Sequence, residues 1–159
     1  MPSQRPKCYV ASPLGFSEAG RHYYHEVYLP ALAKVVTPVD PWSLTAPGEI
    51  ADAHAAGRER DMMLTIGHRN VVAIRECTLL VAYLDGQELD SGTVVEVGFA
   101  AGIGLTCLGL RTDLRQHGEL AMAVNLQVET LILESGGQIS SSLDELVGHL
   151  EEATAGHGP

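Results

Sequence analysis

The sequence predicts an α/β fold, a doubly wound sheet of about five mainly parallel strands with helices on both faces. Short apolar runs alternate with longer segments of helical spacing, as in such folds. The run TLLVAYLD, residues 78–85, is almost wholly apolar, which is typical of a central strand covered on both faces. Neither repeats nor low-complexity linkers divide the 159 residues, so we expect one domain over 1–159, with flexible ends at 1–6 and 154–159.

The chain begins with a predicted strand, loop and helix. CYVASPL, residues 8–14, is a short apolar run closed by a Pro/Gly turn. Ser17 is a candidate N-cap, and apolar side chains then recur at helical spacing from Tyr24 to Leu32. This region therefore predicts the first strand and the first helix of the sheet.

A second strand and a long helix follow. VVTPVDPW is a β-branched run with two prolines, which predicts a short strand whose exit loop carries Asp40 and Trp42. A helix is expected from about Pro47 to Glu76, with a break near Gly67.

The second half continues the alternation. After the central strand, GQELDSG predicts a loop before a helix that contains Glu96; LTCLGL and VETLILE predict two further strands, and SSSLDELVGHLEEA a capped amphipathic helix. Parallel sheets of this kind bind ligands at the carboxyl ends of their strands. The loops of interest are those after Leu14, Asp40, Leu84 and Leu110.

Charge and hydropathy restrict the partners. The net charge is −10, and the ten Lys and Arg residues are scattered singly, so a nucleic acid polymer is not an expected partner. No segment reaches the roughly 18 apolar residues of a membrane span, and the N-terminus has no long apolar signal region. We expect a soluble, cytoplasmic protein without membrane partners.

Cysteines and histidines predict neither disulfides nor a metal site. Cys8, Cys77 and Cys107 are odd in number and lie within or beside apolar runs, as buried thiols do. The seven histidines lack the paired spacing of metal ligands. We therefore expect neither a metal nor another cofactor.

The stretch DSGTVVEVGFAAGIG places one carboxylate, Glu96, in an otherwise apolar helix. Thr93 and Glu96 fit a capping box, in which the glutamate turns back onto the helix N-terminus. Alternatively, a glutamate in the first turn after a central strand lies at the ligand end of the sheet and can attack a sugar carbon. Gly98, Gly102 and Gly104 fall inside the helix, which argues against a dinucleotide site.

Five ordered segments of the chain, from Cys8 to about Leu146, resemble the nucleoside 2-deoxyribosyltransferases: YVASPLGFSEAGR, DPW, LDGQELDSGTVVEVGFAAGIG, GLRTDLRQHGE and VNLQVE. The resemblance implies a flavodoxin-like domain that moves 2-deoxyribose between purine or pyrimidine bases by double displacement. Its partners would be free deoxynucleosides and nucleobases. The family pattern D-x-G-x-x-x-E matches Asp90, Gly92 and Glu96 without a gap.

The resemblance also implies roles on the sugar side. Glu96 would be the nucleophile, Tyr9 would hold it in place, and Asp90 would contact the sugar hydroxyls, with Gly92 allowing close approach. Asp90 alone also suits an N-cap, and Tyr9 an ordinary strand aromatic. Related monophosphate N-glycosidases place a serine where this chain has Asp90. A carboxylate there repels phosphate, which favours the unphosphorylated nucleoside.

On the base side, Phe16 and Trp42 would sandwich a planar base, or simply pack in their loops. Several relatives have an aspartate at the position of Asn70 that is credited with protonating the departing base. An asparagine can orient a base but supplies no proton at neutral pH. Ser12 stands where the family commonly has glycine, and it either narrows the pocket or adds a hydroxyl contact.

Asn125 corresponds to a family asparagine that reaches the sugar from a neighbouring subunit, which implies a homo-oligomer with shared active sites. A turn asparagine is the alternative. Two other functions stay open: a nucleoside or 5′-monophosphate N-glycoside hydrolase of the same fold, and a non-catalytic nucleoside- or nucleotide-sensing module.

Overall fold

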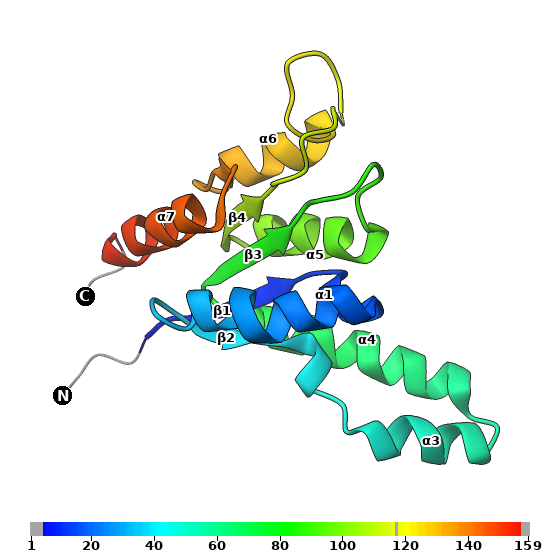
Figure 1. The fold of residues 1–159 in the computed structure, drawn as a ribbon. Helices are drawn as coiled ribbons and strands as arrows, with labels where there is room; N and C mark the ends of the chain where they lie inside the picture. Colours follow the sequence, from blue (N-terminus) through cyan, green and yellow to red (C-terminus); the bar gives the residue numbers. More distant parts are fainter. Residues whose placement is uncertain (1–4, 117, 157–159) are drawn as a thin grey trace.

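Five strands form one sheet in the order β2-β1-β3-β4-β5, and every neighbouring pair is parallel (Figure 1). This computed structural model describes residues 5–116 and 118–156. The strand order is that of flavodoxin-like folds, so the predicted fold class is confirmed. The predicted flexible ends fall mostly outside the described residues. The strands are β1 Lys7–Ala11, β2 Thr37–Val39, β3 Leu79–Tyr83, β4 Thr106–Leu110 and β5 Ile139–Ser140.

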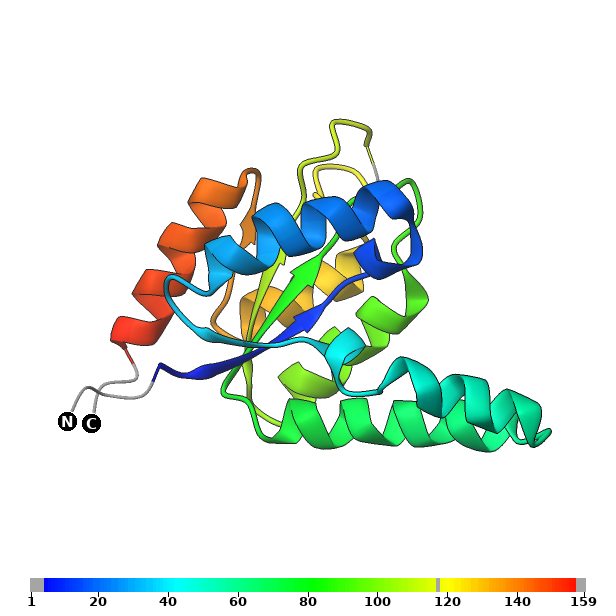
Figure 2. The same ribbon diagram turned by 60° about the horizontal axis from the view of Figure 1, so that its bottom comes forward.

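Helices cover both faces of the sheet. The N-terminal helical segment and α7 pack on one face, and α4, α5 and α6 pack on the other (Figures 1 and 2). None of the described helices is both long and apolar enough to cross a membrane. The helices are α1 Glu18–Tyr23, a π-helical turn Tyr24–Tyr28, α2 Leu29–Leu32, α3 Pro47–Ala55, α4 Glu59–Arg75, α5 Ser91–Gly102, α6 Leu126–Glu134 and α7 Leu143–Ala155.

The core divides according to the alternation of side chains along the strands. Tyr9 and Leu80 point to the face covered by α4, α5 and α6, whereas Cys8 and Val10 point to the opposite face. All three cysteines are buried and unpaired, as expected. β2 is an edge strand, a position that tolerates Pro38.

The prediction of a strand at VETLILE is wrong, because this segment lies in α6. Asn125 caps the helix by accepting a hydrogen bond from the Gln127 backbone N–H at 3.0 Å. Val128 and Ile132 are buried four residues apart, on one face of the helix. A short apolar run is ambiguous between strand and helix, and here the helix is supported by both the cap and the buried face. The fifth strand is β5 instead.

The long helix expected from Pro47 to Glu76 is two helices, α3 and α4. The break lies at Gly57, whose φ of +64° is the left-handed conformation that favours glycine, and not at Gly67, which lies inside α4. The two helices form a hairpin that extends beyond the edge of the sheet (Figures 1 and 2).

Gly137 is required by a close approach to β4. A Cβ at this position would overlap the backbone carbonyl oxygen of Cys107. Gly137→Ala is expected to lower the free energy of unfolding by about 3 kcal/mol, because backbone in the core must move. Gly148→Ala in α7 is the matched control, since its Cβ would meet nothing within 4 Å. Urea unfolding of both variants tests this, and equal stabilities would contradict it.

Candidate active site

A cavity of about 360 Å³ lies at the carboxyl end of the sheet. Its walls come from the segments after β1 and β2, from α3 and α4, and from the first turns of α5. Tyr9 and Asn125 are the predicted site residues that do not line it. The lining residues are Ser12, Phe16, Pro41, Trp42, Ile50, Met63, Ile66, Asn70, Asp90, Gly92, Thr93 and Glu96.

Glu96 is joined to the sheet by a hydrogen bond. The Tyr9 hydroxyl, from β1, donates to Glu96 Oε1 at 2.6 Å, and the Tyr9 side chain is fully buried. The capping box considered for Thr93 and Glu96 does not form, because Asp90 caps α5 instead. Glu96 therefore lies in the second turn of the helix, not in the first as expected, and its side chain is turned to the cavity and Tyr9.

The environment of Glu96 raises its pKa to about 6. Burial is the main cause; the Tyr9 hydrogen bond acts in the opposite direction, and the nearby Asp90 charge raises the pKa further. The pKa of Tyr9 is itself raised by burial and by the Glu96 charge, so the shared proton stays on the phenol. Glu96 is thus mostly ionised at neutral pH, yet only weakly solvated, which suits a nucleophile.

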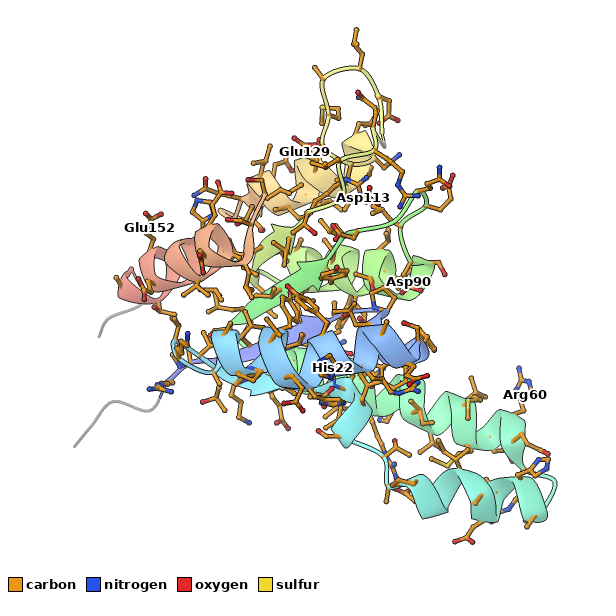
Figure 3. The ribbon with its side chains drawn as sticks, viewed as in Figure 1. His22, Arg60, Asp90, Asp113, Glu129 and Glu152 are labelled. Carbon is orange, nitrogen blue, oxygen red and sulfur yellow. The ribbon has the colours of Figure 1, made fainter. Side chains whose placement is uncertain are left out.

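Asp90 lies at the N-terminal end of α5 (Figure 3). Its Oδ2 accepts hydrogen bonds from the Thr93 backbone N–H at 2.8 Å and from the Thr93 hydroxyl at 3.0 Å. The helix cap is therefore a real role of Asp90, as the spacing suggested. Since both donors use Oδ2, Oδ1 is left for a ligand, and the cap and a sugar contact are compatible.

The loop after β2 is fixed by a buried phenol. Asp40 Oδ1 accepts from the Tyr24 hydroxyl at 2.8 Å and from the Trp42 backbone N–H at 3.0 Å. The Phe16 and Trp42 rings pack edge to face, with centroids 4.8 Å apart and planes at 83°. In this arrangement a planar base can stack on only one of the two rings, rather than between them. Gly15 leaves the space that the indole occupies.

The remaining predicted residues occupy different environments. Ser12 Oγ accepts from the Leu14 backbone N–H at 3.1 Å, so it stabilises the turn after β1 at the cavity wall. Asn70 Oδ1 is enclosed and has no hydrogen-bond partner among the described residues. Asn125 caps α6 outside the cavity, a role close to the turn asparagine considered above.

The apolar cavity residues of the helical hairpin were not predicted. Ile50 comes from α3, and Met63 and Ile66 come from α4. Met63, Ile66 and Asn70 are spaced three and four residues apart on one face of α4. Because Asn70 was predicted to lie at the site, this spacing could have identified Met63 and Ile66 as its neighbours there. Pro41 and Thr93 also line the cavity beside predicted residues.

The ionisable groups of the cavity are few. Its ionisable side chains are the two carboxylates, Asp90 and Glu96. Within residues 5–116 and 118–156, no three His, Cys, Asp or Glu side chains form a group that could hold a metal ion. The chemistry available from these residues is that of a partly buried carboxylate beside an apolar pocket.

Comparisons with known proteins give the family. The family model described as Nucleoside 2-deoxyribosyltransferase matches residues 8–143. No curated protein matches the chain. Similar structures have been solved, and 35 chains match this one. A conserved protein from Enterococcus faecalis V583 is 27% identical, with a TM-score of 0.65, over 94% of this chain and 99% of that one.

Two further structures share the fold at lower identity. A 2-desoxiribosyltransferase from Leishmania mexicana is 23% identical, with a TM-score of 0.66, over 92% of this chain and 97% of that one. A CMP N-glycosidase from Clostridium botulinum is 17% identical, with a TM-score of 0.53, over 92% and 98%. The family match spans most of the chain, and the strand order agrees with it. The chain belongs to the nucleoside 2-deoxyribosyltransferase family.

Proposed function

We propose that the protein transfers 2-deoxyribose between the nucleobases of free 2′-deoxynucleosides. The observation that carries this proposal is Glu96, which accepts a 2.6 Å hydrogen bond from Tyr9 at the wall of the cavity. One side of the cavity is polar and the other is mainly apolar. Asp90, Thr93 and Glu96 supply the polar groups. The apolar surface comes from the aromatic loops, which carry Phe16 and Trp42, and from the hairpin of α3 and α4. A deoxynucleoside has the same division between sugar and base.

The reaction would proceed in two displacements. A Glu96 carboxylate oxygen bonds to the anomeric carbon while the bond from that carbon to the base nitrogen breaks. A second base then attacks the same carbon and releases Glu96. Each step inverts the configuration, so the product retains that of the substrate. Tyr9 orients Glu96, Asp90 binds a sugar hydroxyl, and Gly92 allows the sugar to approach.

Two observations favour an unphosphorylated sugar and a base as acceptor. The Asp90 carboxylate borders the cavity and would repel a 5′-phosphate. The side chains of Pro41, Trp42 and Ile50 offer a base an apolar surface but offer water few hydrogen bonds. Transfer therefore agrees better with this cavity than hydrolysis of a monophosphate does.

Base exchange between deoxyinosine and free adenine tests the proposal. New deoxyadenosine is the expected product. Deoxyribose released at the same rate with and without adenine would instead identify a hydrolase. Binding of nucleoside without turnover, and with equal affinity in Glu96→Ala, would identify a sensing module.

We also propose a homo-oligomer in which a neighbouring subunit completes the site. Asn125 does not line the cavity of its own chain. Glu96 and Asn70 border a second, open groove of about 450 Å³ between α4 and α5, whose wall includes the exposed Val95. Mixing and co-refolding inactive Glu96→Ala with inactive Asn125→Ala should restore part of the activity if sites are shared. No recovery in mixed oligomers, or full activity of Asn125→Ala, would contradict this.

The pH dependence should report the Glu96 carboxyl. Because the nucleophile must be ionised, kcat/KM is expected to fall as the pH drops through about 6. Tyr9→Phe removes a hydrogen bond that lowers the pKa of Glu96, so the acid limb should move to higher pH. Rate profiles from pH 4.5 to about 9 check this. An unchanged midpoint in Tyr9→Phe would show that another group controls the limb.

A further inference from the structure

We propose that the base leaves without a proton from the enzyme, so that this protein selects nucleosides whose bases are stable as departing anions. The inference rests on the proposed function. It follows from the groups that the cavity places around the base and from those it lacks.

Of the side chains with which the hairpin of α3 and α4 lines the cavity, Asn70 is polar, and the others are apolar. Its Oδ1 is enclosed without a partner, and its Nδ2 makes no hydrogen bond to the described residues. The amide N–H groups are therefore what Asn70 can offer to a ligand. A carboxamide donates a hydrogen bond but does not release a proton at neutral pH.

The two carboxylates of the cavity are committed to other tasks. Asp90 Oδ2 accepts two hydrogen bonds from Thr93 and caps α5, and its Oδ1 is assigned to a sugar hydroxyl. Glu96 accepts from Tyr9 and must itself be ionised to attack the sugar. Neither group is therefore a proton donor to the base in the same step.

The hydroxyl groups near the cavity do not supply a proton to the base either. The Thr93 hydroxyl donates to Asp90, and Ser12 stabilises its turn; neither is acidic enough to protonate a base at neutral pH. Tyr9 is fully buried outside the cavity lining, and its raised pKa makes it a poor acid. No histidine lines the cavity among the described residues.

The step balances without an enzyme acid. As Glu96 bonds to the anomeric carbon, the electron pair of the breaking bond moves to the base nitrogen. The base departs as an anion that accepts a hydrogen bond from Asn70 Nδ2, and water protonates it afterwards. In the reverse step, the incoming base loses its proton to water. Transition-state charge on the base is then stabilised by a dipole alone.

The rate of bond cleavage should therefore depend steeply on the base. Single-turnover release is measured from 2′-deoxyuridines carrying methyl or hydrogen at C5, whose base anions are less stable, and from those carrying fluorine or bromine, whose base anions are more stable. The rate is expected to rise at least about tenfold from methyl to bromine, as linear free-energy behaviour requires when no acid assists. Deoxynucleosides of adenine and 6-chloropurine provide the same contrast for a purine.

Two variants locate the effect at position 70. Asn70→Asp introduces a group that can carry a proton. The variant should raise the rate at which the poorest leaving group is released by about tenfold or more, so that the rate depends less on the base. Asn70→Leu keeps a similar volume without a donor; it should slow every substrate and keep the order. Thermal melting checks that both variants fold.

Equal wild-type rates across both base series would overturn the inference, since chemistry is isolated in a single turnover. If the release rate depends on the base as steeply in Asn70→Asp as in the wild type, the steep dependence does not arise from the lack of an acid at position 70. Absence of base release from every nucleoside is a different result, because it would reject the proposed function itself.

Discussion

Replacing Glu96 by alanine is expected to lower the rate of base exchange by about 10⁴-fold or more, because the carboxylate that would form the covalent bond to the sugar is removed. Among the residues that the structure describes, the other carboxylate lining the cavity is Asp90, which caps α5 and is held there by Thr93. Binding of deoxynucleoside should change far less than the rate, since the aromatic loops and Asn70 remain. The assay is formation of deoxyadenosine from deoxyinosine and adenine.

Two controls separate chemistry from folding. Glu96→Gln keeps the size of the side chain and a contact with Tyr9 but is a poor nucleophile, so it should be as inactive as Glu96→Ala. Glu134→Ala removes an exposed glutamate from the end of α6 and should leave the rate unchanged. Glu96→Ala protein that is folded and retains more than about a tenth of wild-type exchange would exclude a glutamyl intermediate.

Replacing Asp90 by serine is expected to shift the preference from free nucleosides toward 5′-monophosphates by on the order of 10²-fold. Two unit charges about 4 Å apart at a protein surface repel by about 4 kcal/mol, of which solvent and counter-ions will screen a part. Serine removes the charge and caps a helix about as well as aspartate does, so stability should change little. The measurement is the ratio of kcat/KM for deoxycytidine and its 5′-monophosphate.

Asp90→Asn is the matched variant. It also caps the helix without a charge, so it should admit phosphate, but it keeps a carbonyl oxygen for a sugar hydroxyl. A substrate ratio that changes in neither variant would show that Asp90 does not face the 5′ end of the sugar. Equal melting temperatures would confirm that the cap survives in both.

Much of the fold could be predicted from local sequence. The apolar run that became β3 and the alternation around it were sufficient for the doubly wound sheet, because a strand buried on both faces needs helices to cover it. The N-cap at Ser17 and the presence of a cap on the last helix were also readable, since capping depends on residues only two or three positions away; the structure places that second cap at Ser142. Most predicted site residues line one cavity because strand-end loops meet at one edge of a parallel sheet.

The secondary-structure predictions were wrong where the local sequence was compatible with more than one structure. VETLILE carries both strand and helix propensity, and its environment selected the helix: Asn125 caps it, and Val128 and Ile132 pack under it. The long helix broke at Gly57 because a hairpin requires a left-handed residue there, whereas Gly67 is tolerated inside a helix.

The sequence by itself determined the parallel sheet, the family resemblance and the position of one carboxylate before a helix and a second within it. Only the tertiary structure decided between the roles of these acids. The spacing from Thr93 to Glu96 allowed a capping box, but Asp90 takes the cap and Tyr9, eighty-seven positions away in sequence, holds Glu96. Such a contact depends on how β1 and α5 pack, and the free energy of burial that raises the pKa of Glu96 arises only there.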